Sequence, residues 1–175
     1  MRNQVLLGLA VVGLWIAVTG ESCSSADNSG TAVGSASTSS SAAASQQTVF
    51  QVGQTVKVGN VLLFTVTGVQ SSEGTDFEKP GNGQYLIVKV SFQNVSSKSQ
   101  RVSSMLSFDL RDGSGQSYNE TFLTSAPKPP DGEIAPNDKL AGGLTYDVPM
   151  HQSFKLYFKN DVFSGGAVVV DLGAH

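Results

Sequence analysis

The side chains most able to do chemistry in this sequence are few and far apart. Cys23 is the single cysteine, and the two histidines are His151 and His175. Nucleophilic catalysis needs a serine or cysteine beside a base that a third group orients. His175 is the last residue, His151 follows Pro149 in an expected turn, and no G-x-S-x-G segment is present. The sequence therefore predicts a protein that is not an enzyme.

Acidic residues in turns are the remaining candidates for holding a metal ion. Calcium takes hard oxygen ligands from carboxylates, amides and backbone carbonyls. Asp112, Asn119 and Glu120 lie around one expected hairpin and form the first candidate set. Two further sets lie in other loops: Asp76 with Glu78, and Asp131 with Glu133 and Asp138. None has the spacing of an EF-hand loop, and acidic turn residues are ordinarily solvated, so calcium is the one ion considered and no other cofactor is expected.

Cys23 follows features of an export signal. Val5–Val18 is an uncharged apolar run, shorter than the about 20 residues of a spanning helix and suited to a signal-peptide core of about 7–15 residues. A cysteine at this place resembles the lipid-attachment site of bacterial lipoproteins, where diacylglycerol is joined to the thiol. Ser22 fits the position before that cysteine, whereas Gly20 and Glu21 depart from the pattern. The resemblance implies a membrane anchor through lipid at Cys23; cleavage with release and an uncleaved apolar anchor are the alternatives.

Composition divides the chain into three parts. Residues 1–22 are the lipoprotein-type signal peptide, and residues 23–47 are rich in Ser, Ala and Gly with almost no charge. Such a segment cannot bury enough apolar surface to offset the entropy of ordering, so a disordered tether is expected. Residues 48–175 form one domain that is long enough to bury a core. The net charge of −3, with Lys and Arg scattered singly, argues against nucleic acid as a partner.

Residues 84–95, QYLIVKVSFQNV, carry the clearest structural signal. Apolar residues occupy every second position from Leu86 to Phe92, and the opposite set is mostly polar apart from Ile87. Side chains alternate faces along a strand, so the stretch predicts a half-buried β-strand whose apolar face other strands must cover. Ile87 and Tyr157 would point outward and form a patch on one sheet, which either a loop or neighbouring strand covers or a partner binds.

The same alternation recurs along the domain and gives about eight short strands. The segments that show strand character are 51–59, 61–69, 84–95, 100–103, 106–111, 140–148, 153–159 and 167–172, and residues 116–119 could pair back after a turn. Within 106–111, Leu106, Phe108 and Leu110 are expected to face inward. The polar residues 71–83 and the proline-rich residues 121–139 are expected to be loops. Half-buried strands separated by turns predict an all-β antiparallel sandwich rather than a parallel α/β sheet.

Five segments of the domain resemble a bacterial family of extracytoplasmic immunoglobulin-like domains, mostly of unknown function and often found in lipoproteins. They are VGQTVKVGNVLLFTVTGVQ at 52–70, GQYLIVKVSFQNVSSKS at 83–99, FDLRDGSGQSY at 108–118, IAPNDKLAGGLTYDVP at 134–149 and FKLYF at 154–158. Small secreted immunoprotective antigens of mycobacteria are similar to the same fold. The resemblance implies an immunoglobulin-like antiparallel β-sandwich outside the cytoplasm, and it offers no catalytic motif to transfer.

Two features of these segments have a local physical reason. Gly142-Gly143 would let a neighbouring segment pass close to the strand that contains them. Asp112–Tyr118 is expected to be a hairpin whose glycines take positive φ angles.

The function expected from these features is that of a non-enzymatic cell-envelope lipoprotein, which displays an immunoglobulin-like module for contact with an extracytoplasmic protein or a cell-wall polymer. The alternative is a small-ligand- or calcium-binding protein that uses the loops at 71–83 and 121–139. The expected location is outside the cytoplasm, either anchored to the bacterial cell membrane through lipid at Cys23 or secreted. The sequence names no ligand-binding residue.

Overall fold

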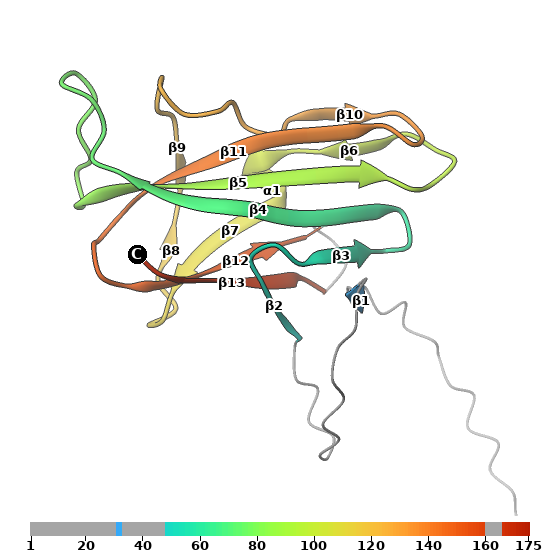
Figure 1. Ribbon diagram of the computed structural model, residues 1–175, viewed down its shortest axis with the longest axis horizontal. Helices are drawn as coiled ribbons and strands as arrows, with labels where there is room; N and C mark the ends of the chain where they lie inside the picture. The colour runs from blue at the N-terminus through green and yellow to red at the C-terminus, as the bar shows by residue number, and fades with distance from the viewer. Residues whose placement is uncertain (1–30, 33–47, 160–165) are drawn as a thin grey trace, which may run out of the picture.

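The computed structural model describes residues 31–32, 48–159 and 166–175 of the chain. The predicted signal peptide over 1–22, most of the predicted tether over 23–47 and lipid attachment at Cys23 lie outside these residues. The described part is an all-β sandwich of two facing sheets (Figure 1), so the sandwich predicted from the alternating pattern is confirmed. Within the described ranges, no helix is long and apolar enough to cross a membrane.

The larger sheet has the strand order β1-β3-β4-β5-β11-β9. Its strands are β1 (Thr31–Ala32), β3 (Thr55–Val58), β4 (Leu62–Ser72), β5 (Gln84–Asn94), β11 (Lys139–Val148) and β9 (Glu120–Thr121). All pairings in this sheet are antiparallel. The predicted strand 84–95 is therefore confirmed as β5, which lies between the long strands β4 and β11.

The smaller sheet has the order β2-β13-β12-β7-β8. Its strands are β2 (Val49–Gln51), β13 (Val168–Ala174), β12 (Ser153–Phe158), β7 (Phe108–Asp112) and β8 (Ser117–Tyr118). β2 pairs with β13 in parallel, the one departure from antiparallel order among the described strands. A two-stranded ribbon joins β6 (Gln100–Val102) to β10 (Gly132–Ile134), and α1 (Ser104–Ser107) is one helical turn between β6 and β7.

The space between the sheets is filled by the inward-facing half of each strand. Leu86, Val88, Val90 and Phe92 of β5 are each at most 1% exposed. Four phenylalanine rings from both sheets pack together with centroids 4.7–6.1 Å apart: Phe64, Phe92, Phe108 and Phe158. Aromatic side chains bury large areas and gain from offset or tilted ring contacts, so this layer is a main source of the stability of the sandwich.

Three predictions about the strands are wrong. The proline-rich residues 121–139 were expected to be a loop but contain β10, which pairs with β6. Leu106 was expected in the core but is 66% exposed, because Ser103–Ser107 closes a helical turn (Ser107 N to Ser103 O, 2.9 Å) that breaks the two-residue alternation. The predicted strand 51–59 is divided between β2 and β3, which belong to opposite sheets. The division falls at Gly53, whose φ of 88° favours glycine.

The outward patch predicted from Ile87 and Tyr157 on one sheet is wrong, because Ile87 lies on β5 of the larger sheet and Tyr157 on β12 of the smaller one. Ile87 is 5% exposed and packs with Tyr85 and Leu123 against Ala126 in a second small core. Tyr157 is half-buried, and the guanidinium carbon of Arg111 lies 4.7 Å from the centre of its ring. The prediction that another part of the chain covers Ile87 is therefore confirmed, and the alternative that a partner binds at Ile87 is wrong.

Candidate functional site

Residues 122–131, called the strap below, lie across the outer face of the larger sheet. Leu123 of the strap covers Ile87 on β5, and the Gly143 N–H of β11 donates to the Lys128 carbonyl at 2.9 Å. A Cβ placed on Gly142 would lie 2.6 Å from the same carbonyl oxygen, so only glycine permits this approach. The close passage predicted at Gly142-Gly143 is confirmed, and the strap is the segment that passes.

The loop between β4 and β5 meets the strap at one end of the sandwich (Figure 1). The Glu78 carboxylate accepts the Thr124 hydroxyl at 2.7 Å and the Thr124 N–H at 3.2 Å. The base of this loop is held by Asp147 of β11, which accepts the N–H groups of Gly81 and Asn82 at 2.7 and 2.9 Å. The two loops proposed from the sequence as an alternative ligand site are thus joined to each other and to the sheet.

Phe77 lies in the β4–β5 loop and is 99% exposed. The turn that carries it is closed by Thr75, whose hydroxyl accepts the N–H groups of Phe77 and Glu78 at 3.3 and 3.1 Å. The Tyr85 hydroxyl donates to the Lys79 carbonyl at 3.0 Å on the other side of the turn. Because hydrogen bonds already hold the turn, a partner that binds the exposed ring of Phe77 would lose little entropy by ordering this loop.

A pocket of about 240 Å³ lies on the other side of the strap, between α1, β7, β8, β9 and β11. Its lining includes Ser104, Met105, Glu120, Phe122 and Tyr146. Met105 is 78% exposed and Phe122 is 72% exposed. The pocket therefore combines aromatic and apolar side chains open to solvent with two acidic side chains, Glu120 of β9 and Asp109 of β7.

Glu120 has an unusual electrostatic environment. Both of its carboxylate oxygens are buried and neither has a hydrogen-bond partner. Burial raises the pKa of Glu120; the nearby Ser104 hydroxyl lowers it in part, and the negative charge of Asp131 raises it further. The Ser104 hydroxyl is directed to Asp131 Oδ2 at 3.2 Å, which leaves Glu120 without a donor. Buried polar groups in proteins are nearly always paired, so this carboxylate stands out.

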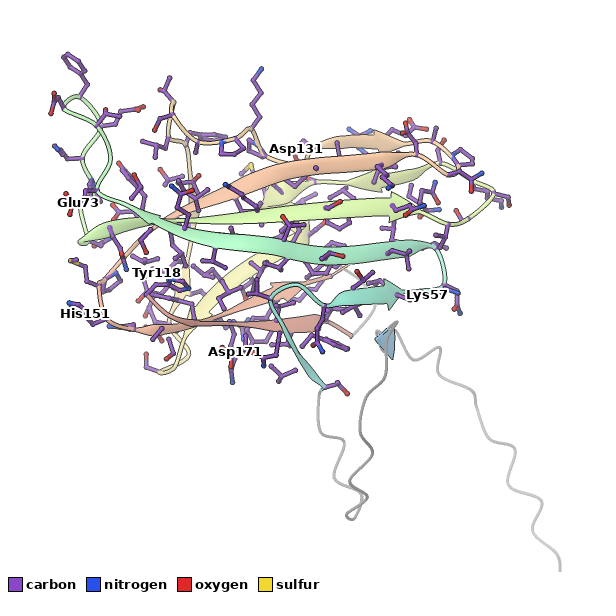
Figure 2. The ribbon with its side chains drawn as sticks, viewed as in Figure 1. Lys57, Glu73, Tyr118, Asp131, His151 and Asp171 are labelled. Atoms are coloured by element: carbon purple, nitrogen blue, oxygen red, sulfur yellow. The ribbon has the colours of Figure 1, made fainter. Side chains whose placement is uncertain are left out.

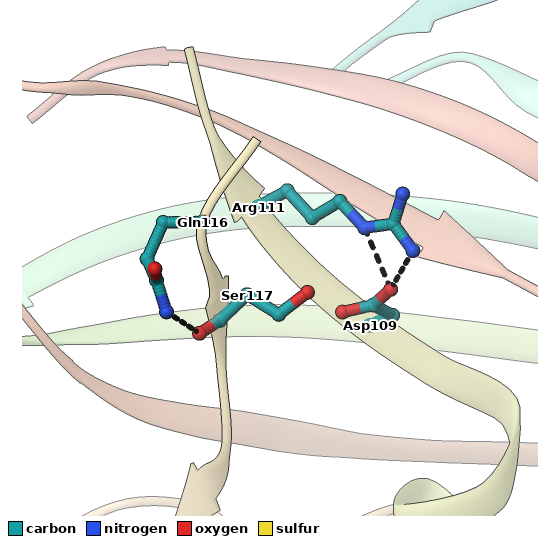
Figure 3. Close-up of polar contacts among 4 residues, drawn as sticks. All are labelled: Asp109, Arg111, Gln116 and Ser117. Atoms are coloured by element: carbon teal, nitrogen blue, oxygen red, sulfur yellow. Dashed lines mark hydrogen bonds and ion pairs between the residues drawn. The ribbon is translucent and has the colours of Figure 1, made fainter. Parts of the chain in front are cut away.

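The other two acidic groups near the pocket are paired. Asp131 also accepts the Ser104 N–H at 2.7 Å. Asp109 on β7 forms an ion pair with Arg111: its Oδ2 accepts hydrogen bonds from Arg111 Nε, at 2.8 Å, and from Nη2 (Figure 3). Lys, Arg and His are absent from the described residues that line the pocket. Glu120 is consequently the one carboxylate there that is left without compensation.

Tyr146 forms the inner wall of the pocket and responds to the same charges. It is 2% exposed and lies opposite Glu120 in the β11–β9 pairing. Burial raises the pKa of Tyr146, and the negative charges of Glu120 and Asp109 add to the effect. Its hydroxyl therefore stays neutral at any physiological pH.

Asp112, the first calcium candidate, is occupied by protein donors. Its Oδ1 accepts the Ser114 hydroxyl at 2.6 Å and the N–H groups of Ser114 and Gln116 at 2.8 and 3.0 Å. Its Oδ2 accepts the Tyr118 hydroxyl at 2.8 Å. The Ser114 hydroxyl is the largest cause that lowers the pKa of Asp112, to about 2, with Tyr118 and the Gln116 N–H assisting against desolvation. The carboxylate closes the β7–β8 hairpin. The positive φ predicted for the glycines of this hairpin is confirmed at Gly115, with φ of 89°, and is wrong at Gly113.

The calcium sets gain no support from this arrangement. Asn119 and Glu120 line the pocket, whereas Asp112 does not. Among the described residues, no group of three or more His, Cys, Asp and Glu side chains could hold a metal ion. In the other sets, Glu78 is bonded to Thr124 and Asp131 to Ser104. His151 is exposed at the β11–β12 turn, well apart from Asp131 (Figure 2).

Sequence reasoning missed the most informative residues of this region. Phe77, Met105 and Phe122 are apolar residues at positions where the two-residue alternation is absent, and nothing local shows that they stay exposed. Glu120 was considered only as an oxygen ligand. One signal was available: an apolar residue in a polar loop, as in TDFEK around Phe77, is a common feature of recognition loops.

The comparisons with known proteins agree with this fold. A family model described as "Domain of unknown function (DUF4352)" matches residues 50–168. The yjhA protein from Bacillus subtilis is similar in structure with a TM-score of 0.55 and 22% identity, over 71% of this chain and 99% of that one. None of the curated proteins matches the sequence.

Two further structures are similar at lower identity. The ycdA protein from Bacillus subtilis, a candidate lipoprotein, has a TM-score of 0.55 and 16% identity over 65% of this chain. The match spans only 37% of the ycdA chain. MPT63, a secreted protein from Mycobacterium tuberculosis, has a TM-score of 0.45 and 16% identity, over 69% of this chain and 85% of that one.

Proposed function

The chain belongs to the DUF4352 family of domains of unknown function, and we propose that it is a non-enzymatic recognition module that works outside the cytoplasm and binds a protein partner. The proposed contact surface consists of Phe77, Met105 and Phe122. These side chains are 99%, 78% and 72% exposed. That exposure, on segments held to the sheet by hydrogen bonds, is the observation that carries the proposal, because rigid exposed aromatic residues are the usual anchors of protein interfaces.

The three residues lie along one continuous region. Phe122 lines both the Glu120 pocket and the hollow beside Lys128 on the strap. Phe77 shares a third hollow with Thr124 at the end where the β4–β5 loop meets the strap. A partner that follows the strap would therefore touch all three apolar side chains. A protein with alternating apolar and polar groups supports such contact better than a uniformly polar cell-wall polymer does.

The location outside the cytoplasm rests on the N-terminal sequence. Val5–Val18 has the length of a signal-peptide core, and the single cysteine follows it. We propose that lipid joined to Cys23 anchors the domain to the membrane, with residues 23–47 as the tether. The similarity of fold to a candidate lipoprotein is consistent with anchoring.

A small-ligand role is the alternative, and the volume of the Glu120 pocket disfavours it. The Glu120 pocket encloses about 240 Å³, which falls below the about 300–1,000 Å³ of typical ligand sites. The pocket is therefore better suited to one side chain of a partner than to a whole ligand.

The contact surface is tested by photo-crosslinking in living cells. A photo-reactive amino acid replaces Phe77 or Phe122 in the full chain, and a matched control replaces Lys155, an exposed residue of β12 on the other sheet. We expect the same protein to be captured from positions 77 and 122 and not from 155. Capture at 77 should also be lost when Phe122→Ser is introduced. Equal capture at all three positions would contradict the proposal.

The anchor is tested separately by growing cells with labelled palmitate. The full chain should take up label and the Cys23→Ala variant should not. Equal labelling of both chains would remove the lipid anchor and leave release as the remaining interpretation.

A further inference from the structure

The Glu120 pocket holds a buried carboxyl group without a hydrogen-bond partner, on the surface proposed above for protein contact. We propose that this pocket receives the guanidinium group of an arginine side chain from the protein partner, so that the arginine and Glu120 form a two-point ion pair between the aromatic walls. The inference rests on the proposed function, since it names the group that this surface recognises.

The charge of the pocket calls for a cation. Asp109 is neutralised by Arg111, and Asp131 accepts two hydrogen bonds from Ser104. Glu120 has neither a cation nor a donor. An unpaired buried carboxylate costs free energy that a bound cation would recover.

The geometry favours a guanidinium over an ammonium group. Both oxygens of the same carboxylate are free, which matches the two parallel N–H donors of arginine. The rings of Phe108, Tyr118, Phe122 and Tyr146 line the pocket, and a planar, weakly hydrated guanidinium stacks on aromatic rings. An ammonium group is more strongly hydrated and offers no planar pair of donors.

Calcium fits this place less well than arginine does. The ion takes six to eight oxygen ligands, and the described residues contain no group of three acidic or histidine side chains able to hold a metal. Apart from Glu120 and the tyrosine hydroxyls, the lining offers the side-chain oxygens of Ser104, Asp109 and Asn119. Asp109 is already paired with Arg111, and the Ser104 hydroxyl is directed to Asp131. The chemistry of the lining therefore points to an organic cation.

Entry of the arginine requires one small movement. The Glu120 oxygens are shielded from solvent, so a side chain of the rim has to move before a partner atom reaches them. Met105 is 78% exposed and unbranched, and its three rotatable bonds let it turn aside at little cost. Met105 would then cover the aliphatic part of the arginine.

The test uses N-acetyl-arginine methylamide as the probe and the full chain in detergent micelles. The chain has three methionines, so labelling their methyl groups for NMR gives at most three signals. Met105 lines the pocket, whereas Met150 does not and serves as the internal control. We expect the probe to shift the Met105 signal alone, with at least a tenfold weaker response to the lysine analogue and none to the neutral citrulline analogue.

Two variants and a pH series decide the role of Glu120. Glu120→Gln should reduce the response at least tenfold, whereas Asp131→Asn, a matched change at a carboxylate that already has donors, should leave most of it. In the unaltered chain the response should fall on acidification as Glu120 becomes protonated. Asp109 and Asp131 also face this region. The loss on acidification is therefore assigned to Glu120 only if the Asp131→Asn chain keeps the pH dependence of the unaltered chain.

An equal response to arginine and citrulline, or an unchanged response in Glu120→Gln, would overturn the inference. If the crosslinks from positions 77 and 122 are obtained and the arginine response is absent, the proposed function stands and only the arginine pocket is wrong. If the arginine response is present without crosslinks, the pocket stands and protein contact through Phe77 is wrong.

Discussion

Two carboxylates that are close in sequence, Asp112 and Glu120, have opposite environments. Asp112 accepts four hydrogen bonds from Ser114, Gln116 and Tyr118, all within its own hairpin. Glu120 lies on β9, just before the strap, and its carboxylate accepts none. The pKa of Asp112 is lowered to about 2, and that of Glu120 is raised.

The difference separates a structural carboxylate from a candidate binding group. The β7–β8 hairpin supplies its own donors and needs no other part of the chain. The strap is held by distant residues, such as Gly142, Gly143 and Glu78. Its Asp131 accepts the hydrogen bond of the Ser104 hydroxyl, and Glu120 on β9 is left unpaired. A hairpin of this kind stabilises the fold, whereas Glu120 is an unpaired carboxylate that a partner can relieve.

The largest expected effect is on the strap. Gly142→Ala places a Cβ 2.6 Å from the Lys128 carbonyl oxygen and the Pro130 nitrogen, so the strap must shift. We expect a loss of about 2 kcal/mol of unfolding free energy. The control is Gly113→Ala in the hairpin, where a Cβ meets nothing within 4 Å and the expected change is below about 0.5 kcal/mol. Denaturant unfolding followed by circular dichroism measures both, and equal losses would break the contrast.

The next effect concerns the paired carboxylate. Asp112→Ala removes the acceptor of the hairpin and should lower the melting temperature, while Asp76→Ala at an exposed loop position should not. Because the pKa of Asp112 is about 2 when folded and 3.8 ordinarily, its contribution is complete above pH 3.8. It is lost as the pH falls through about 2. Melting curves between pH 2 and 6 should show this extra acid dependence in the unaltered chain and not in the Asp112→Ala chain. The same acid dependence in these two chains would refute the prediction.

Glu120 should respond with the opposite sign. Glu120→Gln removes a buried unpaired charge, so we expect about 1 kcal/mol of added stability at neutral pH. The folded state with a raised pKa binds the proton more tightly than the unfolded state does, so the stability of the unaltered chain falls as the pH rises through that pKa. The gain should therefore vanish in acid. Asp131→Asn, which removes an acceptor that Ser104 uses, should be destabilising, and a destabilised Glu120→Gln chain would remove the contrast.

The smallest effect is local. Thr124→Val removes the hydroxyl that donates to Glu78 at 2.7 Å, an exposed bond for which we expect about 0.5 kcal/mol. Loosening the strap should speed hydrogen exchange at the Gly143 N–H, which donates to Lys128. Ser125→Ala is the neighbouring control, and no change of exchange in either variant would show that the β4–β5 loop does not hold the strap.

Much of the sandwich could be predicted because its signal is local. The alternation from Leu86 to Phe92 identifies a buried face directly, since successive side chains of a strand point to opposite sides. The same rule failed at Leu106, where a single helical turn changes the phase. It also failed to show that Ile87 is covered, because the cover comes from Leu123 far along the chain.

The candidate site could be predicted only in part for the same reason. The loops at 71–83 and 121–139 were identified as possible binding segments from their composition, and the Glu78–Thr124 contact joins them. Glu120 was noticed as an acidic residue, but its lack of partners depends on where Ser104 and Asp131 lie. No spacing in the sequence encodes that arrangement.

The sequence by itself determined the strands, the faces that they bury and the glycines at which another segment can pass, because these follow from neighbouring residues along the backbone. The tertiary structure alone decided that the strap covers Ile87, that Phe77 and Phe122 stay exposed, and that Glu120 is left without a donor. Pairing and exposure are set by side chains that meet across the sheet from distant parts of the chain, so they exist only once the sandwich has formed.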